Sequence, residues 1–258
     1  MNPPGAPTPV RAVLIGAGGR MGQALLTAAA GSAALTFTAA IVSSDSALLG
    51  AAAPGGALHY RADLAAALAG ADVAIDFSSA TATAATLSAC RAAGTPLLLG
   101  TTGFAASLEV QFTAAAREIA LLVAANTSIG VTVLAELVRI AAQALPPPFV
   151  VSITESHHAG KRDAPSGTAL TLAAAARAAR TAATGAPAEI DIESIREGDI
   201  VGEHAVRFAA AGEELTLAHK ASDRGLFATG ALAAALWLSS RPPGRYDMRD
   251  FLAIKTAT

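Results

Sequence analysis

The densest group of chemically capable side chains lies in one segment, from Glu155 to Thr168, with the sequence ESHHAGKRDAPSGT. It holds two of the five histidines, His157 and His158, together with Lys161 and Arg162. Imidazole and ammonium groups can transfer protons, and cationic side chains attract carboxylates. The segment therefore predicts a site for an anionic substrate, with a proton donor at hand.

The same segment ends in residues that suit the start of a helix. Ser166 is a good N-cap residue, and Gly167 and Thr168 would then lie in the first turn of a helix. The N–H groups of a first helical turn lack intrahelical acceptors and can bind an anion. We expect this helix N-terminus to bind a substrate carboxylate beside the cationic side chains.

Adjacent histidines can also indicate a metal site. If His157 and His158 lie on a strand, their side chains point to opposite faces. The sequence has one cysteine, Cys90, and no second histidine pair to complete a ligand set. We therefore expect no metal site here.

A second informative segment is the turn Gly16–Gly22, with the sequence GAGGRMG. It follows an apolar run, Val10–Ile15, that reads as a buried strand, and precedes a helix expected over Gln23–Ala30. Glycines allow close approach of a pyrophosphate, and the helix N-terminus favours its charge. Met21 takes the place of the third glycine in a strict G-x-G-x-x-G, but the strand–turn–helix context still predicts a dinucleotide site.

Residues after the second expected strand, Leu35–Val42, bear on the choice between NAD and NADP. No carboxylate stands at the strand end, although Asp45 is close, and no arginine follows. Ser43 and Arg20 could receive a 2′-phosphate, or Asp45 could turn inward to a ribose hydroxyl. We favour NADP or the use of both cofactors and leave the choice between NADPH and NADH open.

Strand-like and helix-like segments alternate through the first half of the chain. Further strands are expected over Asp72–Phe77, Pro96–Leu99 and Ala120–Ala124, and helices over Thr81–Ala93 and Ser107–Ile119. Alternation of this kind predicts a parallel sheet with helices on both faces. The carboxyl ends of its strands share one edge, where the glycine turn, Gly100–Gly103 and Ala124–Ser128 would meet.

The pattern changes after three consecutive prolines, Pro146–Pro148. A strand over Val150–Glu155 leads into a charged loop, Ser156–Pro165, and a long alanine-rich helix begins at Ser166. Three more strands are expected over Ile190–Ile195, Glu203–Ala209 and Glu213–His219, the last two joined by a turn at Ala211-Gly212. The final segments, Phe227–Ser240 and Asp250–Ile254, read as helical. The second half therefore adds an α+β unit.

Composition and charge exclude several classes of protein. The 258-residue chain has a net charge of −2 and only 4% aromatic residues, so no nucleic-acid partner is indicated. No uncharged run is long enough to span a membrane, and Met1–Pro9 lacks the apolar core of a signal peptide. A single cysteine fits a reducing compartment. We expect a cytoplasmic protein.

Together these segments resemble the 4-hydroxy-tetrahydrodipicolinate reductase (dihydrodipicolinate reductase) family. Glu155–Thr168 matches the pattern E-x-H-H-x-x-K-x-D-x-P-S-G-T of that family, and the resemblance covers nearly the whole chain. Other matching segments are Gly16–Gly22, Ile75–Ser78, Gly100–Phe104, Ala124–Asn126, Arg196–His204, His219–Ser222 and Ala234–Leu238.

The resemblance implies a Rossmann-like α/β domain, residues 1–126 and 234–258, that binds NADPH or NADH. An inserted α+β domain, residues 127–233, would bind a small dicarboxylate and form a homotetramer through its sheets. The implied reaction is the reduction of 4-hydroxy-tetrahydrodipicolinate to tetrahydrodipicolinate with loss of water, in lysine and diaminopimelate biosynthesis. The nicotinamide would donate a hydride, and the enzyme a proton to the adjoining carbon.

The resemblance also implies roles for individual residues. Lys161 matches the proton donor, and His157 a residue that donates or accepts a proton. His158, Gly167 and Thr168 match contacts to the substrate carboxylates, and we add Ser166 to this set. The matching cofactor contacts are Gly16, Ala17, Gly18, Gly19, Arg20, Met21, Gly100, Thr101, Thr102, Ala124, Ala125, Asn126 and Thr127, to which we add Ser43.

The chain departs from the family pattern in two places. Many members carry an acidic and then a basic residue where this chain has Val42 and Ser43, which bears on cofactor preference. The segment between Gly185 and Arg196 is shorter than in many members, which bears on the edge of the substrate domain.

Two other functions fit parts of the sequence. A semialdehyde or amino-acid dehydrogenase of similar build would need a nucleophilic cysteine or a different loop, and Cys90 falls within an expected helix. A dinucleotide-binding sensor would bind the cofactor without oxidising it, and would have no need of Lys161.

Overall fold

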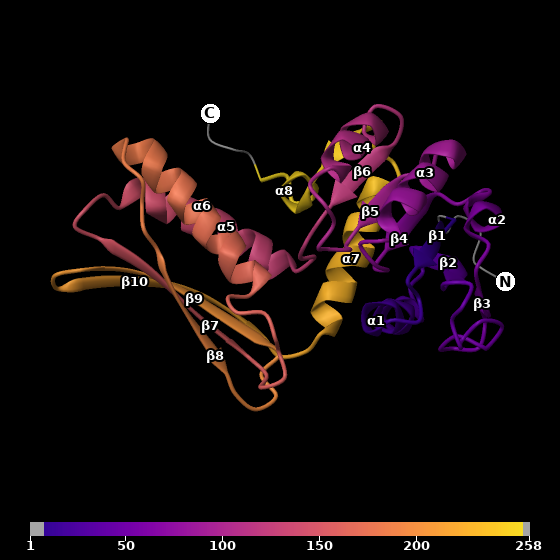
Figure 1. Ribbon diagram of the computed structural model, residues 1–258, viewed down its shortest axis with the longest axis horizontal. Coiled ribbons are helices and arrows are strands. Elements are labelled where there is room, and N and C mark those ends of the chain that lie inside the picture. The colour runs from indigo at the N-terminus through magenta and orange to yellow at the C-terminus, as the bar shows by residue number, and fades with distance from the viewer. Residues whose placement is uncertain (1–7, 255–258) are drawn as a thin grey trace. The chain divides into compact units, whose positions relative to one another are not determined.

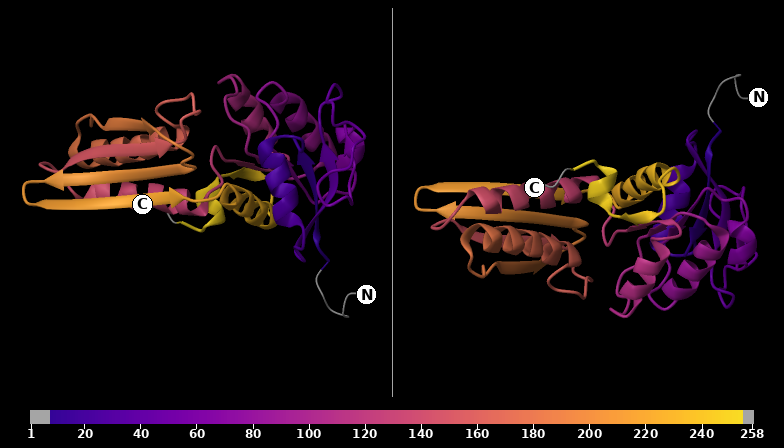
Figure 2. Two further views of the ribbon diagram at one scale, coloured as in Figure 1. Left: turned by 90° about the horizontal axis from the view of Figure 1, so that it is seen from below. Right: turned by 90° about the horizontal axis from the view of Figure 1, so that it is seen from above.

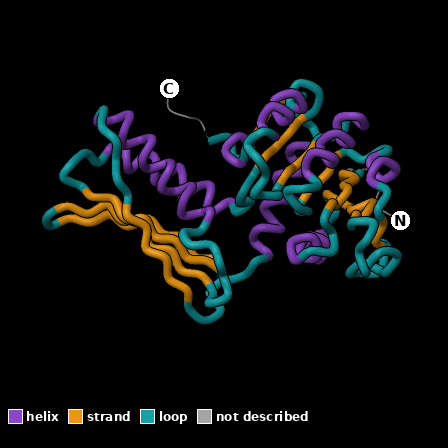
Figure 3. The backbone as a smooth tube through the Cα atoms, viewed as in Figure 1, coloured by secondary structure: helices purple, strands orange, loops and turns teal. Residues whose placement is uncertain are grey.

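The computed structural model describes residues 8–254, so residues 1–7 of the tail expected over Met1–Pro9 lie outside the described part. The chain separates into two compact units, each with its own sheet (Figures 1 and 3). The first comprises the described parts of Met1–Thr127 and Phe227–Thr258, and the second is Ser128–Leu226. The chain returns to the first unit at Phe227, earlier than the expected residue 234, because one continuous helix, α7 (Gly225–Leu238), spans that position.

The first unit is built on a seven-stranded sheet in which every pair of neighbours is parallel. Its spatial order is β11-β6-β5-β4-β1-β2-β3. The strands are β1 (Val10–Ile15), β2 (Leu35–Ile41), β3 (Tyr60–Arg61), β4 (Val73–Asp76), β5 (Leu97–Leu99), β6 (Ala120–Val123) and β11 (Gly244–Tyr246). Apart from β11, this is the strand order of a Rossmann fold, which confirms the expected fold class.

Alternate residues of the central strands pack into two separate cores, one on each face of the sheet. Leu14 and Ile75 pack with residues of α1 and α7, whereas Val13 and Ala74 pack with residues of α2, α3 and α4. The helices of this unit are α1 (Arg20–Ala29), α2 (Leu64–Leu68), α3 (Thr83–Ala93), α4 (Leu108–Ala115), α7 and α8 (Met248–Phe251). Apolar side chains on both faces of each strand therefore specify a sheet buried between two helical layers.

The second unit is a four-stranded mixed sheet in the order β10-β9-β7-β8. Its strands are β7 (Val150–His157), β8 (Asp191–Arg196), β9 (Gly202–Ala210) and β10 (Glu213–Ala221), and its helices are α5 (Ile129–Ala144) and α6 (Gly167–Thr184). The two helices lie side by side on one face of the sheet (Figures 1 and 2). Val138 and Leu172 of these helices share a core with Ile153 and Phe208 of the strands.

Several elements differ from the sequence expectations. β7 continues through His157, which pairs with Arg196 of β8, so Ser156 and His157 belong to a strand and not to the charged loop. The helix α1 begins at Arg20, before the expected Gln23. The helix α5 was not expected, and neither were the short elements β3, α2 and β11. Over the described residues, no helix is long and apolar enough to cross a membrane.

Candidate active site

The charged segment is organised around a buried carboxylate, Glu155. Glu155 and His157 are two residues apart on β7, so their side chains lie on the same face of the strand. Glu155 Oε2 and His157 Nδ1 form a short hydrogen bond, and Glu155 Oε1 accepts hydrogen bonds from Arg196 Nη2 (2.6 Å) and the Ser166 N–H (3.2 Å). The Glu155 side chain is fully buried, that of His157 is 11% exposed and that of Arg196 is 17% exposed. The three form an ordered network with one edge open to solvent.

The network sets the charge of its members. Burial works to raise the pKa of Glu155, but hydrogen bonds from Arg196, Ser194 and His157 outweigh it and hold the pKa at about 2. Loss of solvation lowers the pKa of His157, against the opposing effect of Glu155. At neutral pH, Glu155 is therefore a carboxylate and His157 a neutral imidazole.

Ser166 and His204 connect the helix α6 to the same network. Ser166 is the N-cap of α6, and its Oγ accepts a hydrogen bond from the Ala169 N–H (3.2 Å) while lying 3.1 Å from His204 Nε2. Burial and the nearby His157 lower the pKa of His204 to about 4, so that it is neutral at physiological pH. The His157 and His204 rings meet edge to face, with centroids 5.1 Å apart. Ser166 is therefore the buried N-cap of α6, and its expected contact with substrate stays a prediction.

The N-terminal turn of α6 remains accessible beside this buried cap. Gly167 is exposed, and a Cβ at this position would have no atom within 4 Å. His158 and Thr168 are half-buried. The exposed N-terminal turn of α6 can therefore offer its N–H groups to an anion.

Lys161 is held within its loop by a carboxylate. Its Nζ lies 2.8 Å from both carboxylate oxygens of Asp163, whose backbone oxygen accepts from Arg196 Nη2 (2.6 Å). The Lys161 side chain is 22% exposed, whereas that of Asp163 is 59% exposed. The ammonium group is thus partly shielded, and its partner can move into solvent.

The ligand atoms of Glu155, His157 and His204 lie within 4.8 Å of one another, close enough in principle to hold a metal ion. Both oxygens of Glu155 already accept hydrogen bonds, however, and His204 Nε2 faces Ser166 Oγ. The Arg196 guanidinium also contacts Glu155 and would repel a cation. The three residues are better described as a hydrogen-bond network.

The expected cofactor residues all follow carboxyl ends of the parallel sheet. The turn Gly16–Gly19 follows β1, Ser43 follows β2, Gly100–Thr102 follow β5 and Ala124–Thr127 follow β6. The parallel register brings these ends to one edge, and β1 and β4 lie at the switch point in strand order where α/β sheets bind ligands. The structure thus gathers the cofactor residues predicted from sequence along one edge of the first unit.

The geometry of the glycine turn fits a pyrophosphate. Gly16 has a φ of +78°, and a Cβ there would lie 2.6 Å from Phe77 O. A Cβ on Gly22 would lie 2.4 Å from Gly16 O, so Gly22 allows α1 to pack directly against the turn. Gly22 therefore performs the close-packing role of the third glycine, although Met21 occupies that position in a strict motif.

Because α1 begins at Arg20, the N–H groups of Arg20 and Met21 belong to its first turn and have no intrahelical acceptor. They face the same edge as the glycine turn that precedes them. A dinucleotide phosphate is the anion that this arrangement suits.

Two of the expected cofactor threonines use their side chains within the protein. Thr101 Oγ1 donates to Asp76 Oδ1 (3.3 Å), which also accepts from the Ser78 N–H (2.7 Å). Thr127 Oγ1 donates to the Phe227 carbonyl (2.7 Å). These hydroxyls fix the loops at the strand ends.

The residues that follow β2 also have defined neighbours. Val42 is buried, and a Cβ on Gly18 would contact its side chain at 3.3 Å, so Val42 packs behind the glycine turn. A hydrogen bond from the Ser43 hydroxyl lowers the pKa of Asp45. Ser43, Asp45 and Arg20 are all exposed. Ser43 and Arg20, the candidates for a 2′-phosphate, and Asp45, the candidate for a ribose hydroxyl, are therefore all accessible.

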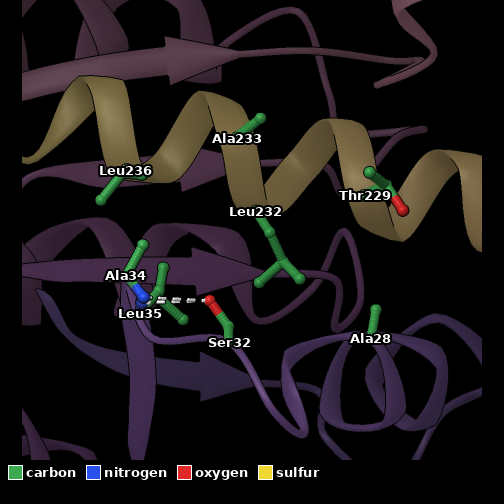
Figure 4. Close-up of a pocket in the computed structure, with 8 residues that line it drawn as sticks. All are labelled: Ala28, Ser32, Ala34, Leu35, Thr229, Leu232, Ala233 and Leu236. Carbon is green, nitrogen blue, oxygen red and sulfur yellow. Dashed lines mark hydrogen bonds between the residues drawn. The ribbon is translucent and has the colours of Figure 1, made fainter. Parts of the chain in front are cut away.

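Two further features, a cavity beside α7 and the residue Cys90, offer no side chain suited to catalysis. A cavity of about 250 Å³ lies between α7 and the start of β2, lined by Leu35, Thr229, Leu232 and other residues without ionisable side chains (Figure 4). It lies at the amino end of β2, away from the strand ends that carry the glycine turn. Cys90 is fully buried within α3, and burial raises the pKa of its thiol to about 12. It is no nucleophile, which weighs against a cysteine-dependent dehydrogenase.

Sequence reasoning missed Glu155, Arg196 and His204 as parts of the site. Glu155 could have been found from its i, i+2 spacing to His157, once β7 was extended by two residues. Arg196 and His204 lie far along the chain on β8 and β9, and only the register of the sheet brings them to β7.

Comparison with known proteins gives consistent matches over both units. The family model "Dihydrodipicolinate reductase, N-terminus" matches residues 10–127, and "Dihydrodipicolinate reductase, C-terminus" matches residues 130–252. The chain is 42% identical to the 4-hydroxy-tetrahydrodipicolinate reductases of Thiobacillus denitrificans and Alkalilimnicola ehrlichii, over 95% of this chain and 99% of each relative. The solved dihydrodipicolinate reductase of Paenisporosarcina sp. TG-14, with dipicolinate bound, has a similar fold. Its TM-score is 0.79 at 23% identity, over 93% of this chain and 97% of that one.

Proposed function

Since the chain belongs to the dihydrodipicolinate reductase family, we propose how its residues carry the reaction of that family. The protein is an NAD(P)H-dependent oxidoreductase that acts as a 4-hydroxy-tetrahydrodipicolinate reductase in lysine and diaminopimelate biosynthesis. The product is tetrahydrodipicolinate, formed with loss of water. The observation that carries the assignment of roles is the buried Glu155–His157–Arg196 network, next to Lys161 and the open N-terminus of α6.

The substrate carboxylates bind at the start of α6. Gly167 and Thr168 contribute N–H groups, His158 contributes its imidazole, and Ser166 holds the turn in place as its N-cap. A helix N-terminus favours a bound anion through both its free N–H groups and its dipole. A dianionic substrate thus finds donors and positive charge in one place.

Lys161 donates the proton that accompanies reduction. Its ammonium group is partly shielded from water and is kept near the loop by Asp163. When the substrate arrives, its carboxylates can replace Asp163 as the partner of Lys161. His157, neutral at rest, accepts or donates a proton at its solvent-facing edge.

The cofactor binds at the carboxyl edge of the seven-stranded sheet and supplies a hydride when bound. Gly16, Ala17, Gly18 and Gly19 form the turn for the pyrophosphate, followed by the N–H groups of Arg20 and Met21. Gly100, Thr101, Thr102, Ala124, Ala125, Asn126 and Thr127 provide the remaining contacts. The fit rests on Gly16 and Gly22, where any side chain would fill the turn.

The enzyme uses both NADPH and NADH. Arg20 and Ser43 are exposed to receive a 2′-phosphate, and the ionised Asp45 beside Ser43 can accept from a ribose hydroxyl. Arg20→Ala should raise the KM for NADPH more than that for NADH, whereas Asp45→Ala should raise the KM for NADH. Equal effects on both cofactors would contradict this division.

The domain roles and the assembly follow the same proposal. The first unit binds the cofactor, and the second binds substrate and forms a homotetramer of the cytoplasm. Both helices of the second unit cover one face of its sheet, and Val150, 65% exposed, lies on the other face. Light scattering of the purified protein at micromolar concentration should give four times the mass of one chain. A monomeric mass would contradict the assembly.

The function is tested by nicotinamide absorbance during turnover. The substrate is generated in place from pyruvate and aspartate semialdehyde with the upstream synthase, and NADH and NADPH are run side by side. Oxidation that depends on the synthase supports the reductase. A folded protein that binds cofactor but oxidises neither form would favour the sensor function instead.

A further inference from the structure

The Glu155 carboxylate is hydrogen-bonded both to the catalytic imidazole and to the start of the substrate-binding helix. Its Oε2 bonds to His157 Nδ1, and its Oε1 bonds to Arg196 and to the Ser166 N–H. We propose that Glu155 is a positioning residue that fixes His157 as its Nδ1–H tautomer, so that Nε2 is the atom that exchanges a proton with substrate. This inference rests on the proposed role of His157.

The tautomer follows from the bonding around the carboxylate. Groups from His157, Arg196, Ser166 and Ser194 converge on the carboxylate of Glu155, and an ionised carboxylate can only accept hydrogen bonds. Arg196 and a backbone N–H are obligate donors. His157 Nδ1 must therefore carry a hydrogen in both charge states of the ring. Only Nε2 changes its protonation.

The other ring nitrogen of His157, Nε2, has space beside it. A Cβ on Gly202, the first residue of β9, would lie 3.2 Å from His157 Nε2 and 3.4 Å from its Cδ2. The missing side chain at Gly202 therefore leaves room at the edge of the ring that bears Nε2. Since Nδ1 is tied to the buried Glu155, the ring has little freedom to move away from an added methyl group.

Charged and titratable groups from every neighbouring element act on this ring. Glu155 on β7 favours the protonated imidazole, whereas Lys161 in the loop and Arg196 on β8 disfavour it. His204 on β9 packs edge to face against the ring and is itself neutral. Removing the charge of Glu155 leaves the two cations unopposed, so the pKa of His157 should fall further.

The same carboxylate couples the two halves of the site. The Ser166 N–H, one residue before α6, donates to the oxygen that also binds Arg196. Displacement of Glu155 would thus disturb both the imidazole and the carboxylate-binding turn. A purely structural carboxylate would affect stability without selecting a tautomer.

The test is Glu155→Gln in the full-length protein. A glutamine has one acceptor oxygen, which Arg196 and Ser166 would retain, so its NH₂ group would face His157 Nδ1 as a donor. Long-range ¹H–¹⁵N NMR spectra distinguish the two imidazole tautomers, and His157→Gln assigns the signal. We expect Nδ1–H in the wild type and Nε2–H in Glu155→Gln.

Activity gives the second readout. In Glu155→Gln we expect kcat to fall at least tenfold, and the acid limb of its pH profile to move to lower pH. Glu155→Asp, which keeps the charge, should restore the Nδ1–H tautomer and part of the rate. Glu193→Gln, the same change at an exposed site on β8, should match the wild type in both measurements.

The tautomer of the wild type needs no variant, so the inference remains testable if Glu155→Gln does not fold. An Nε2–H signal for His157 in the wild type would overturn it. So would a Glu155→Gln protein that keeps both the Nδ1–H tautomer and the wild-type pH profile. The Nδ1–H tautomer in a wild type that oxidises no cofactor would support the positioning role while contradicting the proposed function.

Discussion

Lys161 Nζ lies 2.8 Å from each carboxylate oxygen of Asp163, two residues away in the same loop. The pair holds the ammonium group in place before substrate binds. The pair also explains how the Lys161 side chain is held near the imidazole of His157, although Lys161 lies in a loop and not in a helix or strand. Substrate carboxylates would compete with Asp163 for the same ammonium group.

Replacing Asp163 should separate its competition with substrate from its role in holding Lys161. Asp163→Asn removes a negative charge from a site that binds a dianion, so KM should fall or stay constant. It also frees Lys161 from its partner, so kcat should fall, but by less than in Lys161→Ala. Steady-state kinetics of the two variants side by side provide the measurement. A raised KM in Asp163→Asn would contradict competition between Asp163 and substrate.

His158→Ala should act mainly on binding. The His158 side chain is half-buried and has no bond to Glu155, so its loss should remove the proposed carboxylate contact and leave the proton-transfer groups in place. We expect KM for substrate to rise about tenfold, the equivalent of about 1.4 kcal/mol, with a small change in kcat. His59→Ala, in the first unit, is the control. An unchanged KM in His158→Ala would exclude the carboxylate role.

The cap of α6 should contribute measurably to stability. Ser166 Oγ accepts from the Ala169 N–H and is buried, so Ser166→Ala should lower the free energy of unfolding by about 1 kcal/mol. Ser107 is the N-cap of α4 but makes no side-chain cap hydrogen bond, so Ser107→Ala is a matched control with little effect. Equal losses in both variants, measured by denaturant unfolding, would show that the Ser166 cap contributes nothing particular.

The glycine turn offers a graded test of the cofactor site. A Cβ on Gly22 would lie 2.4 Å from Gly16 O, whereas a Cβ on Gly19 would lie 3.3 Å from the same atom. Gly22→Ala must therefore displace α1 from the turn, and we expect the Kd for NADPH to rise at least tenfold. Gly19→Ala should have a smaller effect. Calorimetric titration of both variants gives the order, and the reverse order would contradict the close-packing role of Gly22.

Acidification should destabilise the protein in two stages. The folded-state pKa of His204, about 4, is below its ordinary value of 6.5, and that of Glu155, about 2, is below 4.5. In both cases the unfolded chain binds a proton first, so stability is present above the unfolded pKa and is lost as pH falls. The free energy of unfolding should decline between pH 6.5 and 4, and again below pH 4.5. His204→Gln should flatten the first decline, and an unchanged slope would contradict it.

Local sequence patterns were sufficient for much of the fold and for the outline of the site. Apolar β-branched runs next to glycines predicted β1, β2 and β4, and Ser166 predicted the start of α6. Short elements were missed because β3 and β11 have two and three residues and depend on pairing with neighbouring strands. Their formation is decided by tertiary contacts rather than by local propensity.

The charged loop shows the same limit within the site. Its histidines and lysine were found from their types and spacing, but His157 was assigned to a loop because polar residues at the end of β7 carry no strand signal. Pairing with β8 and the buried bond to Glu155 hold His157 in the strand. Such pairing depends on residues far along the chain, such as Arg196, 39 positions after His157, which no local pattern reveals.

The central claim is that Lys161 supplies the proton during reduction. The most direct measurement is the rate of nicotinamide oxidation in a single turnover of wild type and Lys161→Ala, each saturated with substrate and cofactor. Lys220→Ala, which breaks an exposed lysine–glutamate pair in the same unit, is the control. We predict that Lys161→Ala binds both ligands but is about 10²- to 10⁴-fold slower, the usual contribution of a general acid. A wild-type rate in Lys161→Ala would remove Lys161 from the mechanism.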